Sequence, residues 1–548
     1  MGIPIVVGVT GHRALRTQDL PMLRAVVTAQ LKQLIASCPN SSFVMLNSIA
    51  SGADTLCALV ALELGMRLIC PLPMPAEEYR KDFSDADAAV FDALILRAER
   101  VFSAPDSSLS LNFTRDDHYR QAGRYVARHS HLLLALWDGS PAKPDGCGTA
   151  EIVAFMLGAN DETAAGCFKA ANDGAVIHID TPKQGAEIKS FDPAVHLLET
   201  EPGSLKSTLE TIDAFNADAE KMADAVTKTE PLVPETILSG MPEGMKQLHV
   251  AYQASDRLSL LFQAQYLCAI QYFSIFGALL VLFFLLYDEM ESNLFLICYG
   301  LLILIYVLAF ARISKGQAHE KYIRYRMFSE TLRAQFFVCA AGSNDNVASA
   351  YTWTQKQEST WIKQAISALL AGESARQSLP DETIQKIWIE GQLAYHEGAY
   401  QRASSRHRIR ESTANCMLAA TFALFILVLA LEFAFDSAMA KTLFMKPFPP
   451  LMLYHSGQTV TLRNLMKILL GLVSAITVFL ANYYGKLSLG RKSTDHNRMA
   501  RLYASAKEQY ASGQIDHALL FSALAREEII EIGNWFSYSR ENPPSLQV

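Results

Sequence analysis

The chain has 548 residues, and its 48 lysine and arginine residues are outnumbered by 55 aspartate and glutamate residues, which gives a formal net charge of −7 at pH 7. Half of the residues are hydrophobic and only 19% are charged, whereas typical soluble domains carry about 25% charged residues. This composition excludes a disordered protein and argues against an entirely soluble enzyme, and the acidic balance argues against direct nucleic-acid binding.

Five short apolar runs in the first 200 residues predict strands that alternate with helical segments. Such alternation is typical of a parallel sheet with helices on both faces. Residues 1–200 therefore predict an α/β domain of the Rossmann-like class. The predicted strands are residues 3–9, 42–47, 67–72, 131–137 and 175–179.

Three of these strands end in glycine-containing turns that open a helix. Glycine lets backbone N–H groups approach a ligand closely, and a helix N-terminus offers unpaired N–H donors to an anion. Because the carboxyl ends of parallel strands meet at one edge of a sheet, we predict that the turns together bind a phosphate-bearing nucleotide, although any one glycine is more often a plain turn residue. The residues are Thr10, Gly11, His12 and Arg13; Ser51, Gly52, Ala53 and Asp54; and Asp138, Gly139, Gly146, Gly148, Thr149 and Glu151.

The two common nucleotide-binding loops are not matched by these turns. The first turn reads Gly-Val-Thr-Gly-His-Arg, which departs from GxGxxG, and the sequence contains no GxxxxGK[ST] loop. Hydride transfer with NAD and hydrolysis of ATP are therefore disfavoured. We predict no cofactor, only a nucleotide-derived ligand.

Charged residues near the turns add candidates with two interpretations each. Arg120 and Arg124 share a helix face, where they either clamp a phosphate or form a solvated surface. Asp54 either receives a ribose hydroxyl or caps a helix, and His12 is expected to contact the ligand. No histidine, cysteine or aspartate cluster predicts a metal site. Nine scattered cysteines without a CxxC pair predict reduced thiols.

Four apolar segments follow a proline-containing stretch. Residues 201–250 predict a linker with one helix, and residues 251–548 predict a helical membrane domain. A membrane-spanning helix needs about 20 apolar residues. Glu432 and Asn482 are polar residues within the last two spans, where they either line a pore or bridge helices, or lie at the interface. The predicted spans are residues 267–287, 293–313, 414–435 and 465–484.

Basic residues flank the spans unevenly, and this predicts their orientation. The loop between the first two spans carries three acidic residues and no basic residue. Lysine and arginine are enriched on the cytoplasmic side of membranes. We therefore expect both termini and residues 314–413 and 485–548 to be cytosolic, and no signal peptide is visible. The basic runs are Arg312, Lys315, Lys321, Arg324 and Arg326; Arg402, Arg406, Arg408 and Arg410; and Lys486, Arg491, Lys492, Arg498 and Arg501.

Residues 1–180 resemble the SLOG superfamily. The resemblance rests on VGVTGHR, SGAD, the segment from Arg115 through YVARHSHLLLALWDG, and GCGTAEI, of which the last with Asp138-Gly139 is similar to a GGxGT phosphate loop. It implies a nucleotide-sensing domain. In the related cytokinin-activating "lonely guy" enzymes, a carboxylate at the position of Glu151 takes part in cleaving an N-glycosidic bond. By this resemblance Glu151 and Arg124 would stabilise an oxocarbenium-like state and position water. The alternative is that Glu151 is only a first-turn residue favourable to the helix dipole.

Residues 318–342, 388–410 and 525–542 resemble SLATT domains, the membrane effector modules often paired with SLOG domains. This resemblance implies a homo-oligomeric effector in a bacterial inner membrane. Such an effector binds a second messenger of ADP-ribose or cyclic-nucleotide type, made by a partner enzyme. It then opens a pore or disrupts the lipid bilayer in anti-phage defence by abortive infection. Two alternatives stay open: a membrane-tethered nucleotide N-glycosidase, and a non-gated anchor that only binds the nucleotide.

Overall fold

The computed structural model describes residues 2–104, 114–141, 148–158, 174–186, 191–226, 230–290, 292–343, 345–372, 378–434, 442 and 461–541. The chain forms two compact units. The sheet unit comprises Met1–Leu258, Tyr325–Ile384 and Gly513–Ser537, and the span unit comprises Ser259–Arg324, Gln385–Ser512 and Tyr538–Val548. The structure thus divides the chain differently from the predicted boundary near residue 250, because two later segments return to the sheet unit.

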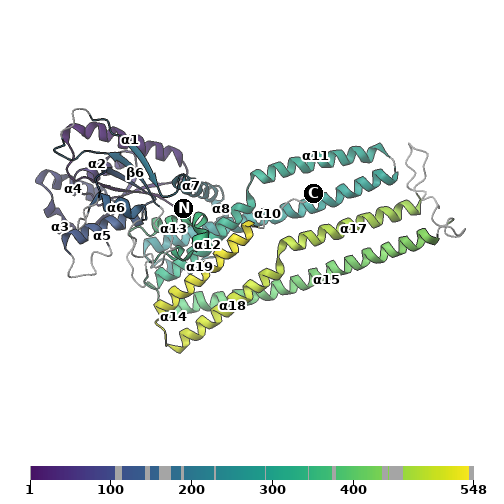
Figure 1. The fold of residues 1–548 in the computed structure, drawn as a ribbon. Helices are drawn as coiled ribbons and strands as arrows, with labels where there is room; N and C mark the ends of the chain where they lie inside the picture. Colours follow the sequence, from purple (N-terminus) through teal and green to yellow (C-terminus); the bar gives the residue numbers. More distant parts are fainter. Residues whose placement is uncertain are drawn as a thin grey trace. The chain divides into compact units, whose positions relative to one another are not determined.

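A seven-stranded sheet lies at the centre of the sheet unit (Figure 1). Its order is β4-β3-β2-β1-β5-β6-β7, and all neighbours pair in parallel except β7, which runs antiparallel to β6. The parallel α/β prediction is confirmed at this level. The strands are β1 (Ile5–Gly11), β2 (Phe43–Leu46), β3 (Arg67–Leu72), β4 (Arg100–Ser103), β5 (Leu132–Trp137), β6 (Ala175–Asp180) and β7 (Val195–Glu199).

The two strands that the sequence did not indicate lie at the edges of the sheet. β4 has four residues, all only partly buried, and β7 exposes most of its side chains. Edge strands of this kind lack the continuous apolar run that marks a strand buried on both faces. The central strands have that run, and β5 is buried over Leu132–Leu136.

Helices cover both faces of the sheet, and the alternation of side chains along the strands explains how. Val6, Val44 and Leu133 point to the face that α5 and α6 cover, where they form one core with Val126 and Ile152. Successive residues of a strand point to opposite faces, so Val7 and Met45, also fully buried, point toward α1 and α2. The helices are α1 (Leu20–Ser37), α2 (Ala53–Glu63), α5 (Arg115–Arg128) and α6 (Thr149–Met156).

The predicted linker at residues 201–250 is part of the packed sheet unit. Its helix α7 (Ser204–Lys221) buries Ile212 and Phe215 completely. Asn216 accepts a hydrogen bond from the backbone N–H of Ile3 at 2.8 Å, and Asp213 accepts one from the Asn40 side chain at 2.7 Å. These contacts join α7 to the start of β1 and to the turn before β2.

The remaining helices complete the described part of the chain. In the sheet unit, these are short helices around the sheet and the helices of residues 325–384 and 513–537. α10, α12 and α19 each contain residues of both units. The remaining helices of the two units are α3 (Ala76–Tyr79), α4 (Asp85–Arg97), α8 (Ala223–Val226), α9 (Glu235–Leu238), α10 (Glu243–Met290), α11 (Asn293–Lys315), α12 (Ala318–Ala340), α13 (Lys356–Leu369), α14 (Asp381–Ile384), α15 (Gly391–Ala434), α17 (Leu462–Leu487), α18 (Leu489–Ser512) and α19 (His517–Glu541).

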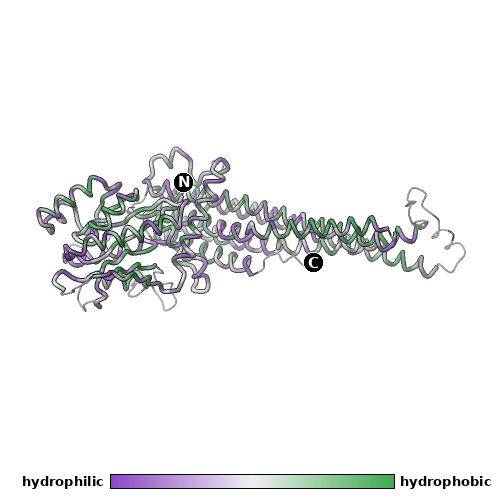
Figure 2. Tube along the Cα trace, turned by 90° about the horizontal axis from the view of Figure 1, so that it is seen from above, coloured by the Kyte–Doolittle hydropathy of each residue, from purple (hydrophilic) through white to green (hydrophobic). Residues whose placement is uncertain are grey.

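The span unit contains four helical stretches long and apolar enough to cross a membrane, within the residues described. They overlap all four predicted spans, although the third stretch ends at Ala430 within the predicted 414–435, and at most 6% of each apolar window is buried. In Figure 2 hydrophobic residues are concentrated along the helices of the span unit. Apolar surface on this scale is stable only when lipid or protein covers it, as expected of a membrane protein.

The four stretches contact one another in the order α11, α10, α17, α15. Phe273 of α10 packs on Tyr306 of α11 with ring centroids 5.2 Å apart, and a Cβ on Gly277 would lie 2.6 Å from the ring of Phe479 in α17. Thr421 of α15 and Thr477 of α17 share a hydrogen bond of 3.0 Å. Small residues and hydroxyl pairs of this kind are typical of helix packing in membranes.

Candidate functional site

The strand order reverses between β1 and β5. From β1 the chain adds β2, β3 and β4 on one side, then returns to add β5 and β6 on the other. In an open parallel sheet, such a reversal leaves a crevice outside the carboxyl ends of the two central strands. A cavity of about 430 Å³ lies there, lined by residues from the turns after β1 and β5 and from helices α5 and α6.

The first two predicted turns are joined by glycine packing. A Cβ on Gly11 would lie 2.4 Å from the Cβ of Ala53, and a Cβ on Gly52 would lie 2.4 Å from the carbonyl oxygen of Arg13. Gly52 also has φ +79°, a conformation that favours glycine. The backbone N–H of Ala53 donates to the carbonyl of His12 at 3.1 Å. These glycines therefore hold the turn after β1 against the start of α2.

The start of α6 has a different geometry. Gly148 is the N-cap with extended backbone, and a Cβ there would meet no other residue that the structure describes within 4 Å. The space beside it belongs to the cavity, which Gly148, Thr149 and Ala150 all line. The first N–H groups of a helix lack partners within the helix, so this end of α6 presents donors next to open space.

Asp138 joins two cavity residues electrostatically. Its backbone N–H donates to Nε2 of His12 at 3.2 Å, and its carboxylate lies 2.9 Å from Nζ of Lys183. Burial opposes ionisation of Asp138, but the Ser140 hydroxyl and Lys183 outweigh it and hold the pKa well below its usual range. Burial lowers the pKa of His12, an effect that Asp138 only partly offsets. Because Nε2 of a neutral His12 accepts the hydrogen bond from Asp138, the ring proton is on Nδ1, and Nδ1 is a hydrogen-bond donor.

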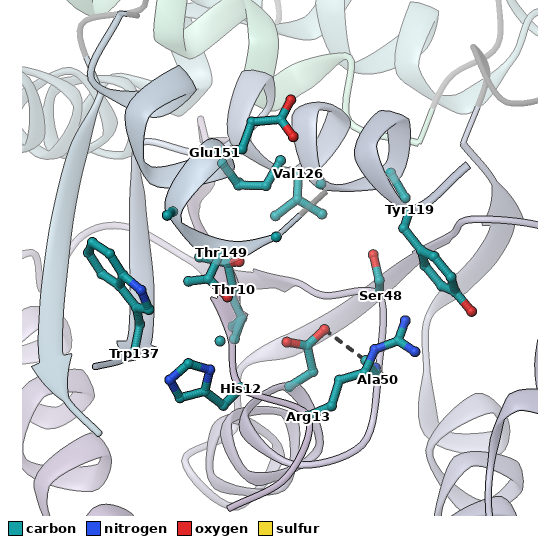
Figure 3. Close-up of a pocket in the computed structure, with 18 of the residues that line it drawn as sticks. Thr10, His12, Arg13, Ser48, Ala50, Tyr119, Val126, Trp137, Thr149 and Glu151 are labelled. Atoms are coloured by element: carbon teal, nitrogen blue, oxygen red, sulfur yellow. Dashed lines mark hydrogen bonds between the residues drawn. The ribbon is translucent and has the colours of Figure 1, made fainter. Parts of the chain in front are cut away.

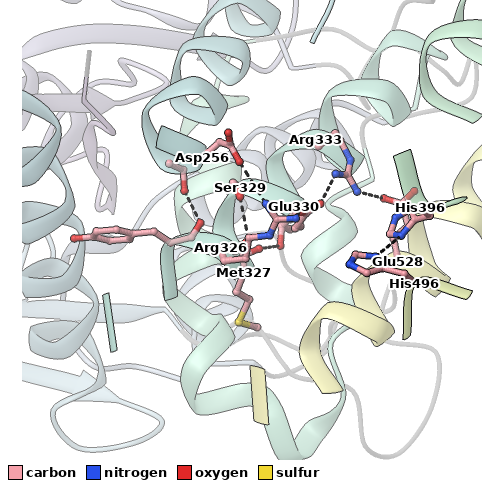
Figure 4. Close-up of polar contacts among 12 residues, drawn as sticks. Asp256, Arg326, Met327, Ser329, Glu330, Arg333, His396, His496 and Glu528 are labelled. Atoms are coloured by element: carbon pink, nitrogen blue, oxygen red, sulfur yellow. Dashed lines mark hydrogen bonds and ion pairs between the residues drawn. The ribbon is translucent and has the colours of Figure 1, made fainter. Parts of the chain in front are cut away.

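Asp54 is a buried carboxyl group that lines the cavity from the first turn of α2. Figure 3 shows the cavity with His12, Arg13 and Glu151 among the residues that line it. Burial raises the pKa of Asp54 to about 7, against the opposing effects of the Ala50 N–H and of Arg13. Near pH 7 the group is therefore about half protonated, and its protonated form donates a hydrogen bond. The turn that precedes it holds Ile49 at φ +50°, a strained conformation for a β-branched residue.

Arginine side chains border the cavity from two elements. The Arg13 guanidinium stacks over the ring of Tyr119 at 4.2 Å from its centroid. Glu151, which lines the cavity, accepts a hydrogen bond from Arg120 at 3.1 Å and another from Arg124 at 3.1 Å. Glu151 thus neutralises part of the positive charge that α5 brings to the site.

The structure brings together residues from all three predicted turns. Thr10, Gly11, His12, Arg13, Asp54, Gly148, Thr149 and Glu151 line the cavity. Ser51, Gly52, Ala53, Arg120, Arg124, Asp138 and Gly139 stand behind the lining, and several of them hold lining residues in place. Gly146 lies outside the described residues, as does the side chain of Glu432. Asn482 is half-buried in α17.

The sequence analysis missed several lining residues, among them Ser48, Tyr119, Trp137 and Lys183. Trp137 is the last residue of β5 and Lys183 follows β6 closely. Their position after a parallel strand was the available signal. Tyr119 is on the helix face that also carries Gly123, and both belong to the segment from Arg115 on which the SLOG resemblance rests.

No protein-family model matches this chain, and comparison with curated proteins gives no match. Among the residues that the structure describes, no group of three or more His, Cys, Asp or Glu side chains is placed to hold a metal ion.

Proposed function

We propose that the sheet unit is a Rossmann-like, SLOG-type sensor that binds a nucleotide-derived messenger of ADP-ribose or cyclic-nucleotide type. The observation that carries the proposal is the 430 Å³ cavity at the strand reversal, with the open start of α6 on one side. Its volume lies in the range of small-molecule sites, about 300–1,000 Å³. A site of this kind suits a phosphate-bearing ligand.

Each side of the cavity suits a different part of such a ligand. Gly148 and Thr149, at the start of α6, line the cavity and suit a phosphate. Arg13 and Lys183 add positive charge, and protonated Asp54 avoids repelling an anion. Trp137 and Tyr119 offer aromatic faces to a base or ribose.

Helix α5 is the element suited to transmit binding. Tyr119, Gly123 and Val126 line the cavity, while the Tyr125 hydroxyl accepts the backbone N–H of Gly372 at 2.7 Å. His129 of the turn after α5 also bonds the carbonyl of Ser367 at 2.7 Å. A ligand that competes with Glu151 for Arg120 and Arg124 would shift α5 and, with it, residues 367–372 at the end of α13 and in the turn after it.

We infer that the span unit is a SLATT-type membrane effector of a bacterial inner membrane. In this proposal the messenger, made by a partner enzyme, causes several chains to open a pore or disrupt the bilayer and so arrests a phage-infected cell. The four apolar stretches contact one another in a row and expose their apolar side chains, which supports assembly of several copies around any pore.

A nucleotide N-glycosidase is the second candidate, favoured by one observation. Glu151 lines the cavity and is bonded to Arg124, so a carboxylate and a cation lie together where an N-glycosidic bond would be held. Both arginine contacts occupy carboxylate oxygens, however, and cleavage needs Glu151 to be released from at least one of them.

The decisive experiment uses the full chain in liposomes with a panel of nucleotides, read by mass spectrometry and by ion flux. We expect one nucleotide to be retained intact and to trigger flux. Gly148→Trp fills open space and should abolish both effects without unfolding the protein, whereas Gly391→Trp, also at a glycine with open space, should leave binding intact. Release of free base that Glu151→Gln abolishes would instead establish the glycosidase, and retention without flux would establish the simple anchor.

A further inference from the structure

Two cations of the span unit, Arg410 and Lys492, lie on packed helices, and neither is paired with a carboxylate of the described residues. Helices α15 and α18 pack along one another, and this packing brings Arg410 of α15 within electrostatic range of the half-buried Lys492 of α18. Among the described residues, neither side chain has an ion-pair partner. Two like charges held together in a partly buried place repel each other unless an anion lies between them.

The local backbone explains why the two helices approach here. α17 ends at Leu487, and its C-cap Ser488, with a φ of +45°, turns the chain into α18. At the next turn, a Cβ on Gly490 would lie 3.4 Å from Nε2 of His407 in α15. The Arg410 guanidinium lies over the ring of Tyr484, 5.5 Å from its centroid. We call these residues, Arg410, Lys492, Tyr484 and His407, the Arg410–Lys492 cluster.

The nearby carboxylates of α15 and α18 form ion pairs with side chains other than Arg410 and Lys492. Glu411 pairs with His407 at 3.7 Å, and Asp495 pairs with Arg491 at 3.6 Å. The surrounding basic side chains outnumber these two acids and are exposed to solvent. They are Arg402, Arg406, Arg408, Arg491, Arg498 and Arg501.

The cluster is placed at the end of two predicted spans. Tyr484 is the last residue of the span at 465–484, and Arg410 lies one helical turn before the span at 414–435. Aromatic and basic side chains at such positions lie at the level of lipid headgroups. By contrast, Lys467 within the last span is already paired with Glu289 at 3.2 Å.

We propose that the Arg410–Lys492 cluster binds the phosphate of an anionic phospholipid. The lipid supplies the missing negative charge, its acyl chains cover the exposed apolar side chains of α15 and α17, and Tyr484 borders the headgroup. The inference rests on the proposed insertion of the span unit into a membrane. It adds a lipid requirement to the helices that would have to move in a gated effector.

The test uses the full chain in detergent, with thermal unfolding and native mass spectrometry as readouts. Phosphatidylglycerol, phosphatidylcholine and inorganic phosphate are the three probes. We expect phosphatidylglycerol to raise the melting temperature and to be retained about tenfold more than phosphatidylcholine, with no effect of inorganic phosphate. Lys492→Met removes the charge but keeps an unbranched side chain of similar length, so the variant should fold. It should be more stable than the wild type in phosphatidylcholine and should no longer respond to phosphatidylglycerol.

Arg498→Gln is the matched control, because Arg498 is exposed on α18 and pairs with Asp495; it should keep the full lipid response. The proposal is overturned if inorganic phosphate stabilises the protein as well as phosphatidylglycerol does, if the two lipids act alike, or if Lys492→Met keeps the preference. Resistance to alkaline extraction from membranes, measured on the same variants, separates loss of this site from failure of membrane insertion.

Discussion

The two units use the same apolar side chains in opposite ways. In the sheet unit, Leu132–Leu136 of β5 are completely buried between two helical layers. In the span unit, Leu301, Leu304 and Leu308 of α11 are 54–61% exposed on a helix whose apolar window is 0% buried. The first unit excludes water from its own interior, while the second needs a surrounding that is itself apolar. Each prediction below tests one side of this contrast.

The largest expected effect concerns a charge buried in the sheet unit. Asp54 has a pKa raised to about 7 by burial, against about 4 in an unfolded chain. Below about pH 4 the group is neutral in both states and stability is unaffected. Between about pH 4 and 7 the unfolded chain loses the proton while the folded chain keeps it, so stability falls as pH rises, by on the order of 4 kcal/mol in total.

Asp54→Asn lacks this titration. Its melting temperature in detergent should match that of the wild type at pH 4 and exceed it increasingly up to pH 8. Melting curves measured across that range check the prediction, and a constant difference between the two proteins would contradict it.

The next effect tests how tightly the turns of the sheet unit are packed. Gly52→Ala places a Cβ 2.4 Å from the Arg13 carbonyl oxygen at a positive φ, which should destabilise the unit by about 3 kcal/mol. Gly65→Ala is the matched control, because Gly65 has φ +78° but open space around its Cβ, so only the backbone strain of about 1 kcal/mol applies. Limited proteolysis with increasing temperature measures both, and equal losses would show that packing at Gly52 is unimportant.

Two exposed leucines, one in each unit, test whether the surface around them faces lipid or water. Leu304→Lys should reduce membrane insertion, since a lysine at the centre of a spanning helix costs about 3 kcal/mol. Leu96→Lys changes a residue that is 86% exposed on α4 of the sheet unit and should have almost no effect. Insertion is measured by alkaline extraction of membranes, and full retention of the Leu304 variant would argue against a lipid-facing α11.

The smallest effect concerns the proposed transmission through α5. Tyr125→Phe removes the acceptor for the Gly372 N–H and should cost about 1 kcal/mol. We expect nucleotide retention to persist while the ligand-triggered flux falls about fivefold. Flux unchanged at equal protein levels would show that the signal does not pass through this contact.

Several features of the chain could be predicted from the local pattern. The apolar runs at the central strands and the four uncharged stretches are signals carried by neighbouring residues, and the structure confirms both as elements. β4 and β7 were not predicted, because short edge strands are only partly buried and lack a continuous apolar run. The helix at α7 was predicted, but its burial was not, because the partners of Asp213 and Asn216 lie more than 170 residues away.

The candidate site likewise combines features that the sequence indicated with features that only the tertiary structure decided. Glycine-containing turns after parallel strands are local features, so the sequence itself indicated Thr10–Arg13, Asp54 and Gly148–Glu151 as one group. The tertiary structure alone decided that Glu151 is held by Arg120 and Arg124, that Lys183 reaches Asp138, and that the helices carrying Arg410 and Lys492 pack together. Charge pairing depends on which distant segments meet, and burial depends on the whole packed unit, so neither is encoded by the spacing of residues along the chain.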